Sequence, residues 1–144
     1  MNGFEILNVI TKDAVSCKYF GGLMAINRLH FKPTSRIFYI CNTDLWENKG
    51  KHWIVMYYIN NNFEYFDPLG IKPDILFSKF MKKYAKHIIF NEKAVQPLNS
   101  STCGEYCIFF SAMRSRDVNF GDIIKYMQYD QIVLDFVNDL TCLH

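Results

Sequence analysis

The sequence between residues 52 and 67, HWIVMYYINNNFEYFD, decides the fold of this 144-residue chain. Two runs rich in β-branched and aromatic residues, 52–60 and 63–67, flank an asparagine-rich turn. Asparagine tolerates the left-handed backbone angles of tight turns, so the pattern predicts a β-hairpin. The motif DPLG (67–70) ends the second strand, because proline cannot donate a hydrogen bond to a ladder.

The segments on either side of the hairpin predict an α+β fold. RIFYICN (36–42) and HIIFN (87–91) are expected strands, and residues 43–51 and 92–102 are expected loops. Predicted helices cover residues 3–14, about 73–85, 103–115 and a last segment from residue 130. Helices and strands occur in blocks rather than in strict alternation. We therefore expect a mixed sheet flanked by helices, in a single domain over residues 1–144.

The apolar spacing also predicts which helix faces are buried. CGEYCIFFSAMRS (103–115) is apolar nearly all round, which is typical of a buried central helix. Pro73 is expected to open one helix and Asp130 to cap another, whereas Gly21–Gly22 and Pro33 indicate an irregular connection. The expected apolar faces are Phe4, Leu7, Ile10 and Ala14; Leu76, Phe77, Phe80, Met81 and Tyr84; and Ile132, Val133, Phe136, Val137 and Leu140.

Composition limits the classes of function. Half of the residues are hydrophobic and 17% are aromatic, so a packed core is expected and disorder is excluded. With 16 basic and 14 acidic residues, the formal net charge of +2 is too balanced to predict nucleic-acid binding. No apolar run reaches membrane-spanning length, so we expect no membrane association. The first residues carry acidic side chains and no long apolar stretch, so we expect no secretion signal.

The five cysteines and four histidines do not suggest a metal site. An odd cysteine count without a secretion signal predicts reduced thiols rather than a disulfide framework. A structural zinc site needs four close ligands, and Cys103 and Cys107 have no second pair near them in the sequence. We therefore predict neither a metal nor a cofactor.

Cys103 is the first candidate for chemistry. Ser100, Ser101 and Thr102 are typical helix-start residues, so the thiol is expected at a helix N-terminus, where the macrodipole favours a thiolate. The alternative is a buried structural thiol, and Cys103 alone leaves both readings open. Cys107 lies one turn further along and is interpreted as core.

The hairpin supplies partners for this thiol. His52 and Asp67 are nearly equidistant from the asparagine turn, so antiparallel pairing brings an imidazole and a carboxylate to one end of the sheet. Such a pair fixes the histidine tautomer and stabilises imidazolium beside a thiolate. Gln96, in the loop before Cys103, can donate its amide to an oxyanion. Together the four residues form a candidate site for cysteine acyl transfer.

With these residues in place, the chain resembles adenovirus-type cysteine proteases (the adenain family). The resemblance rests on GKHW (50–53), on DPLG (67–70), and on Gln96 seven residues before the cysteine of PLNSSTCGEYC (97–107). KDAVSCKYFGG (12–22) and IFYICNTD (37–44) are similar to the N-terminal segment and first strand of that family. The resemblance implies a papain-related fold whose central helix starts at the nucleophilic Cys103. It also implies His52 as base, Asp67 as its orienting acid and Gln96 as oxyanion donor.

The same resemblance implies a viral or virus-derived maturation protease that cuts precursor polypeptides at Gly-containing sites. Such an enzyme would act in the host nucleus or cytoplasm, or packaged in a virion. Adenoviral enzymes are activated by a disulfide-linked peptide, but the corresponding segment here, 83–96, contains no cysteine. An activating peptide would therefore bind non-covalently, and the balanced charge speaks against DNA as an activator.

Two other functions remain open. The third catalytic residue is Asp67, where adenoviral enzymes typically carry Glu and ubiquitin-like-protein proteases use Asp. The chain could therefore be a deconjugating protease that removes modifiers ending in Gly-Gly. It could also be an inactive homologue that binds peptides, in which case Cys103 would react as an ordinary thiol.

Overall fold

The computed structural model describes residues 1–46 and 52–142, so most of the predicted 43–51 loop, with Gly50, lies outside the described residues. The strands are β1 (Phe20–Ala25), β2 (Arg36–Asn42), β3 (Trp53–Ile59), β4 (Asn62–Phe66) and β5 (His87–Phe90). The helices are α1 (Gly3–Lys12), α2 (Ile75–Tyr84), α3 (Cys103–Ser115), α4 (Phe120–Tyr126) and α5 (Asp130–Thr141), with a 3₁₀ turn, η1, at Ser16–Lys18.

The strands form one mixed sheet in the order β1-β2-β3-β4-β5. The two outer pairs, β1–β2 and β4–β5, are parallel, whereas β2–β3 and β3–β4 are antiparallel. β3 and β4 form the predicted hairpin. Asn60 and Asn61 turn the chain with φ angles of 53° and 64°, in the region that asparagine tolerates. The hairpin prediction is confirmed.

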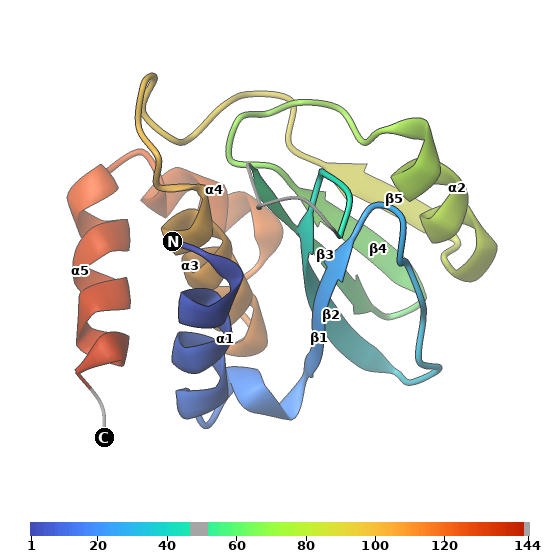
Figure 1. Ribbon diagram of the computed structural model, residues 1–144, viewed down its shortest axis with the longest axis horizontal. Coiled ribbons are helices and arrows are strands. Elements are labelled where there is room, and N and C mark those ends of the chain that lie inside the picture. The colour runs from blue at the N-terminus through green and yellow to red at the C-terminus, as the bar shows by residue number, and fades with distance from the viewer. Residues whose placement is uncertain (47–51, 143–144) are drawn as a thin grey trace.

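Helices cover both faces of the sheet. α1, α3, α4 and α5 lie on one side and α2 lies on the other (Figure 1). Trp53, Val55 and Tyr57 of β3 pack into the core on the α3 side, and Ile54, Met56 and Tyr58 pack toward α2. Because both faces are buried, β3 is a continuous apolar run rather than an alternating one. The predicted α+β class is confirmed.

The central helix α3 is the most buried element of this side. Ten of its 13 residues are buried, from Cys103 and Gly104 at its start to Ser115 at its end. Cys107 is completely buried, as predicted. The position of α3 against the sheet and between its neighbouring helices explains why its sequence is apolar nearly all round.

The predicted face of α1 is wrong except at Ile10. The buried residues are Ile6, Val9 and Ile10, whereas Phe4 is 78% exposed and Leu7 is also exposed. Both stripes have helical spacing, and the one that is buried is the one that packs into the core cluster shared with α3 and α5.

Two helix starts also differ from the prediction. α2 is capped by Asp74, whose side chain accepts from the Leu76 N–H, so Pro73 lies just outside the helix. Of its expected face, Phe77, Phe80 and Met81 are buried. In α5 the N-cap is Tyr129, so Asp130 is the first helical residue rather than the cap. Its carboxylate accepts a 2.7 Å hydrogen bond from Tyr106 Oη of α3.

β1 and α4 were not predicted. The Gly21–Gly22 segment, expected to be irregular, forms β1 with an irregular register beside Phe20, so the segment expected to be the first strand is β2. Within residues 1–46 and 52–142, no helix has the length and apolar character needed to cross a membrane.

Candidate active site

Cys103 is the first residue of α3, and its side chain faces a pocket. Thr102 precedes the helix as its N-cap without a side-chain capping bond, so the first N–H groups of the helix are not covered by that residue. Gly104 has no side chain, which leaves space beside the first turn of the helix. A Cβ there would lie 3.0 Å from Met1 Cβ and 3.3 Å from Ile6 Cδ1. Gly104 therefore makes room for the chain's own first residues.

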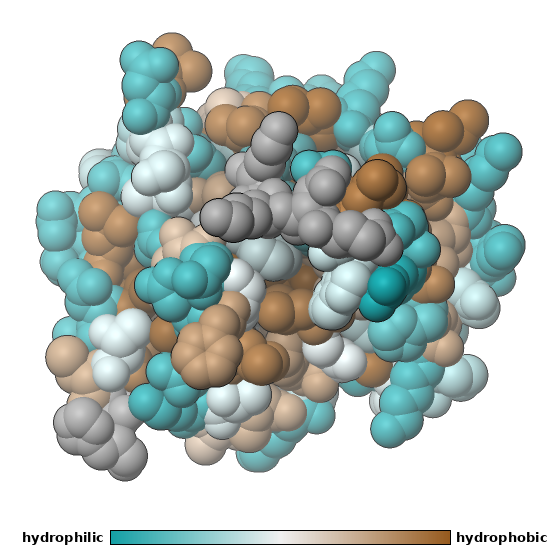
Figure 2. Space-filling view, viewed as in Figure 1, coloured by the Kyte–Doolittle hydropathy of each residue, from teal (hydrophilic) through white to brown (hydrophobic). Residues whose placement is uncertain are grey.

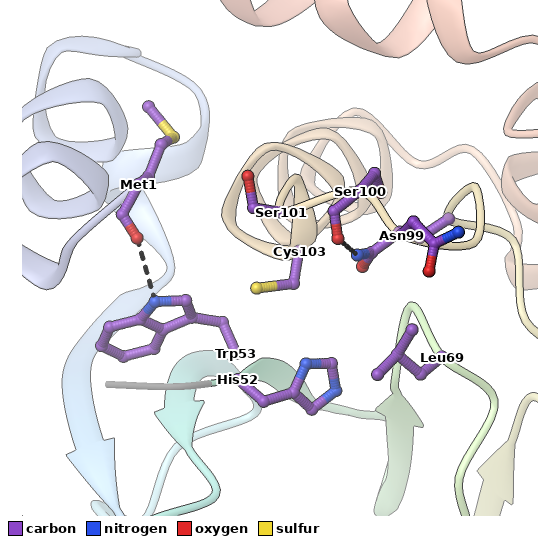
Figure 3. Close-up of a pocket in the computed structure, with 9 residues that line it drawn as sticks. Met1, His52, Trp53, Leu69, Asn99, Ser100, Ser101 and Cys103 are labelled. Atoms are coloured by element: carbon purple, nitrogen blue, oxygen red, sulfur yellow. Dashed lines mark hydrogen bonds between the residues drawn. The ribbon is translucent and has the colours of Figure 1, made fainter. Parts of the chain in front are cut away.

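His52 and Asp67 meet at the end of the hairpin, as the sequence predicted. His52 Nε2 lies 2.6 Å from Asp67 Oδ1, and Asp67 is 2% exposed. The Cys103 side chain faces the imidazole (Figure 3), and the interaction between them raises the pKa of His52 and lowers that of Cys103. Because Nε2 is occupied by Asp67, Nδ1 is the ring nitrogen left for the sulfur. The chain of contacts therefore runs from the carboxylate through the ring to the thiol.

The contacts favour a charged pair at neutral pH. Burial alone would lower the pKa of His52, but the hydrogen bonds to Asp67 and Cys103 outweigh it and raise the pKa to about 9. Burial alone would raise the pKa of Cys103, yet the hydrogen bonds from His52 and from the Trp53 backbone N–H lower it below its ordinary value. Both shifts favour a thiolate beside an imidazolium, because each charged form stabilises the other.

A tight turn holds the Asp67 carboxylate in place. Asp67 Oδ1 also accepts the Leu69 backbone N–H at 2.8 Å, and Gly70 N–H donates to the Asp67 carbonyl at 2.8 Å. Gly70 has a φ of 68°, which glycine adopts without a Cβ penalty. The DPLG motif is thus a turn in which the aspartate side chain accepts from its own backbone two residues on.

Gln96 is 6% exposed and lines the same pocket as Cys103. Its Nε2 donates one hydrogen bond, at 2.8 Å, to the carbonyl of Ser100. Its Oε1 is buried and has no hydrogen-bond partner among residues 1–46 and 52–142. The amide NH₂ carries two hydrogens, so one remains beyond the bond to Ser100.

The pocket in front of the thiol has a volume of about 490 Å³ and contains all of the predicted site residues except the buried Asp67. In Figure 3 the side chains of Cys103 and His52 face each other, with Trp53 and Leu69 on opposite sides of the imidazole. Trp53 is fixed by its indole N–H, which donates to the Met1 carbonyl at 3.3 Å. The lining residues are Met1, His52, Trp53, Leu69, Gln96, Asn99, Ser100, Ser101 and Cys103.

A second pocket of about 270 Å³ adjoins the first and shares Trp53 with it. It lies between the start of α1, the end of β1 and the segment after β2, and it is mostly apolar. In Figure 2 brown surface lines a hollow in the region of α1 and β1. Its lining residues are Gly3, Phe4, Leu23, Met24, Ala25, Asn42, Trp46 and Trp53.

The structure thus places His52, Asp67, Gln96 and Cys103 at one site, while their chemical roles stay predictions. Sequence reasoning missed two backbone donors, the N–H groups of Trp53 and Leu69. The Asp-Pro pair was the available signal for the second, since it is typical of a turn that an aspartate side chain closes. Among residues 1–46 and 52–142, no group of His, Cys, Asp and Glu side chains could hold a metal ion.

Comparisons of sequence find no relative: no family model matches the chain, and no curated protein matches it. Comparisons of structure find solved proteins with a similar fold. The ASFV pS273R protease aligns with a TM-score of 0.67 at 19% identity, over 96% of this chain and 66% of that one. A second structure of that protease gives a TM-score of 0.71 at 18% identity, over 97% and 67% of the two chains.

The SUMO protease Ulp1, with its catalytic cysteine oxidised to a sulfinic acid, aligns with a TM-score of 0.53 at 15% identity, over 97% of this chain and 78% of that one. HopZ1a, bound to IP6 and CoA, aligns with a TM-score of 0.53 at 12% identity, over 87% and 45% of the two chains. The present chain spans about two thirds of the ASFV protease. Its mixed five-stranded sheet and helices have the fold shared by Ulp1 and the ASFV pS273R protease.

Proposed function

We propose that this protein is a cysteine endopeptidase. The observation that carries the proposal is the connected set Cys103–His52–Asp67, with the thiol at the start of α3 and facing an open pocket. A buried structural thiol would have a raised pKa, as burial gives to Cys107 of the same helix, whereas the pKa of Cys103 is lowered. The contrast between two thiols one turn apart favours the nucleophile reading.

The reaction would proceed through a thioester. The Cys103 thiolate attacks the scissile carbonyl carbon and forms a C–S bond, and the carbonyl oxygen becomes an oxyanion. In this proposal the second Gln96 N–H and the N–H of Cys103 would donate to that oxygen. His52 Nδ1 then gives its proton to the leaving nitrogen as the C–N bond breaks. In the second half, His52 takes a proton from water, the water oxygen attacks the thioester, and the C–S bond breaks to restore the thiolate.

Asp67 would orient His52 and stabilise its positive charge, without itself accepting the proton. Trp53 and Leu69 stand on either side of the imidazole, which favours substrates with small residues around the scissile bond. This agrees with the Gly-containing sites that the resemblance to adenoviral enzymes implies. The apolar pocket beyond Trp53 offers a recess for a larger side chain of the same polypeptide.

We propose a maturation role in a virus, with structural precursor proteins as the substrates, because one structural neighbour is a protease of ASFV. The test is cleavage of the source's own structural precursor proteins, with the new termini mapped by mass spectrometry. Wild-type protein should cut next to glycine, and a Cys103→Ala variant should leave the precursors intact. Cleavage that continues in Cys103→Ala would disprove the assignment of the nucleophile.

A deconjugating function is the second candidate, favoured by the alignment with the SUMO protease Ulp1 and by an aspartate as the acid. Activity-based probes made of ubiquitin-like modifiers with Gly-Gly tails separate the two functions. Labelling of Cys103 by a modifier probe, with no cleavage of the precursors, would replace the maturation role with deconjugation.

A further inference from the structure

Asn91 is a buried polar residue just after β5 that no catalytic step uses. It is 7% exposed, and its side chain binds the backbone of Asp67 at both ends. The Asp67 N–H donates to Asn91 Oδ1 at 2.9 Å, and Asn91 Nδ2 donates to the Asp67 carbonyl at 2.6 Å. The asparagine amide therefore continues the β4–β5 ladder by one step beyond the last paired backbone residues, Tyr65 and Phe90.

The same side chain reaches the loop that leads to Gln96. Asn91 Nδ2 donates a further hydrogen bond, at 3.1 Å, to the carbonyl of Lys93. Two residues further on, the N–H groups of Val95 and Gln96 both donate to the Pro68 carbonyl, at 2.9 and 3.1 Å. The turn that carries the acid and the loop that carries the oxyanion donor are thus joined at two points.

Gly70 closes the space between the turn and the loop. A Cβ at this position would lie 2.4 Å from the carbonyl carbon of Lys93 and 2.5 Å from the nitrogen of Ala94. The backbone of the turn therefore packs directly on the backbone of the loop. No side chain separates them, so a movement of one is transmitted to the other.

We infer that Asn91 is a positioning residue that sets the place of Asp67 relative to His52 and ties it to the loop bearing Gln96. The inference rests on the proposed function, since it assigns Asp67 the role of orienting acid. A residue that only stabilised the fold would lower the resistance to denaturation and leave the Cys103–His52 pair unchanged. A residue that positions Asp67 also weakens the His52–Asp67 contact when it is altered, and so reduces the thiolate fraction at Cys103.

The experiment measures the rate of Cys103 alkylation by iodoacetamide as a function of pH in wild-type protein and in Asn91→Asp. The substitution keeps the shape but replaces the donor Nδ2 by an oxygen that faces two carbonyls. We expect the pH midpoint of the alkylation to rise, and kcat for a Gly-containing peptide to fall about 100-fold with little change in KM. Asn91→Ser, which shortens the side chain and can replace only one of its bonds, should change both quantities in the same direction.

Ile123→Val is the matched control, because it removes one methyl group from a fully buried residue of α4 and so lowers stability without touching this turn. All variants are compared below their unfolding transitions, as followed by circular dichroism. An unchanged alkylation midpoint in Asn91→Asp and Asn91→Ser would overturn the inference, as would an equal shift in Ile123→Val.

The alkylation curve does not require a substrate. If the wild-type protein cleaves no peptide, the proposed function fails, yet the shift of the midpoint still decides whether Asn91 controls the Cys103–His52 pair. If the protein cleaves peptides and the midpoint does not move, only the role of Asn91 is lost.

Discussion

The two ends of α3 carry charge in opposite ways. At its C-terminal end, Arg114 binds Glu64 of β4 through two hydrogen bonds of 2.8 and 3.1 Å, and Arg116 binds Asp13 through two of 2.8 and 2.9 Å. At its N-terminal end, Cys103 interacts with the imidazole of His52 and with the backbone N–H of Trp53, and it faces a pocket of about 490 Å³. Both ends suit the helix macrodipole, which favours cations at the C-terminus and anions at the N-terminus.

The difference separates ion pairs that stabilise the fold from a Cys103–His52 contact that faces a pocket. Bidentate arginine–carboxylate contacts satisfy both partners and leave nothing for a ligand. The Asp13 carboxylate shows this, because burial would raise its pKa, but the contacts to Arg116 and Ser16 outweigh burial and lower it. At the other end Cys103 lines the pocket. Substitutions at the two ends should therefore change different properties.

The largest effect on turnover, apart from loss of the nucleophile itself, is expected for Asp67→Asn. Contacts with Asp67 and Cys103 together raise the pKa of His52 to about 9, so loss of the carboxylate lowers that pKa and reduces the fraction of imidazolium. In a nucleophile–His–Asp triad this change costs about 10⁴-fold in kcat. Peptide cleavage measures the rate, and an NMR titration of His52 measures the pKa.

Asp117→Asn is the control for that substitution. Asp117 pairs with Arg36 near the other end of α3, and its side chain is 78% exposed. We expect wild-type turnover and an unchanged His52 titration. Asp67→Asn retaining turnover within tenfold of wild type would show that the carboxylate does not orient the histidine, and the contrast between the two ends would fail.

The hairpin and the site it creates could be predicted from the sequence because both depend on local signals. Asn60 and Asn61 define the turn, and the turn defines which strand ends meet. The proximity of His52 and Asp67 can therefore be predicted from the hairpin alone. The position of Cys103 at a helix N-terminus can be predicted in a similar way, because helix-start residues and an apolar run mark where α3 begins.

The remaining features depend on tertiary packing. The buried face of α1 is decided by the core it packs into, and the stripe with Phe4 has the same spacing as the stripe with Ile6. β1 contains Gly21–Gly22 and lies at the sheet edge, where strand signals are weak, and α4 has only seven residues, too few for a clear period. Asn91 binds the backbone of Asp67, 24 positions away in the sequence, and no local pattern predicts that contact.

A smaller loss of turnover is expected for Gln96→Ala. Removing one donor to the oxyanion costs about 10²- to 10³-fold in kcat. The thiolate itself should be unaffected, because the hydrogen bonds that lower the pKa of Cys103 come from His52 and Trp53. Peptide turnover should therefore fall while the alkylation curve of Cys103 stays at its wild-type position.

Gln128→Ala, at an exposed position after α4, serves as the control and should match wild-type protein in both assays. Should the alkylation curve of Gln96→Ala move as far as its turnover falls, Gln96 would be acting on the ion pair rather than on the oxyanion. The N-terminal end of α3 would then have one function where two are proposed.

The smallest effect on turnover, and the clearest effect on stability, is expected at the other end of the helix in Arg114→Met. The variant leaves Glu64, which is 6% exposed, buried without its partner. Breaking a buried pair in this way costs about 3 kcal/mol in the free energy of unfolding, which urea denaturation measures. Turnover per folded molecule, counted by titrating the reactive thiol, should equal that of wild-type protein.

The double variant Glu64→Leu with Arg114→Met sharpens the comparison. It removes both charges and fills the space with apolar atoms, so most of the lost stability should return, because replacing both partners of a buried pair is often close to neutral. We expect no such repair at the N-terminal end, because the proposed reaction requires both Cys103 and His52. A double variant that regained stability but lost turnover would mean that the Glu64–Arg114 pair positions β4, and with it Asp67, and that the two ends of α3 are coupled through the strand.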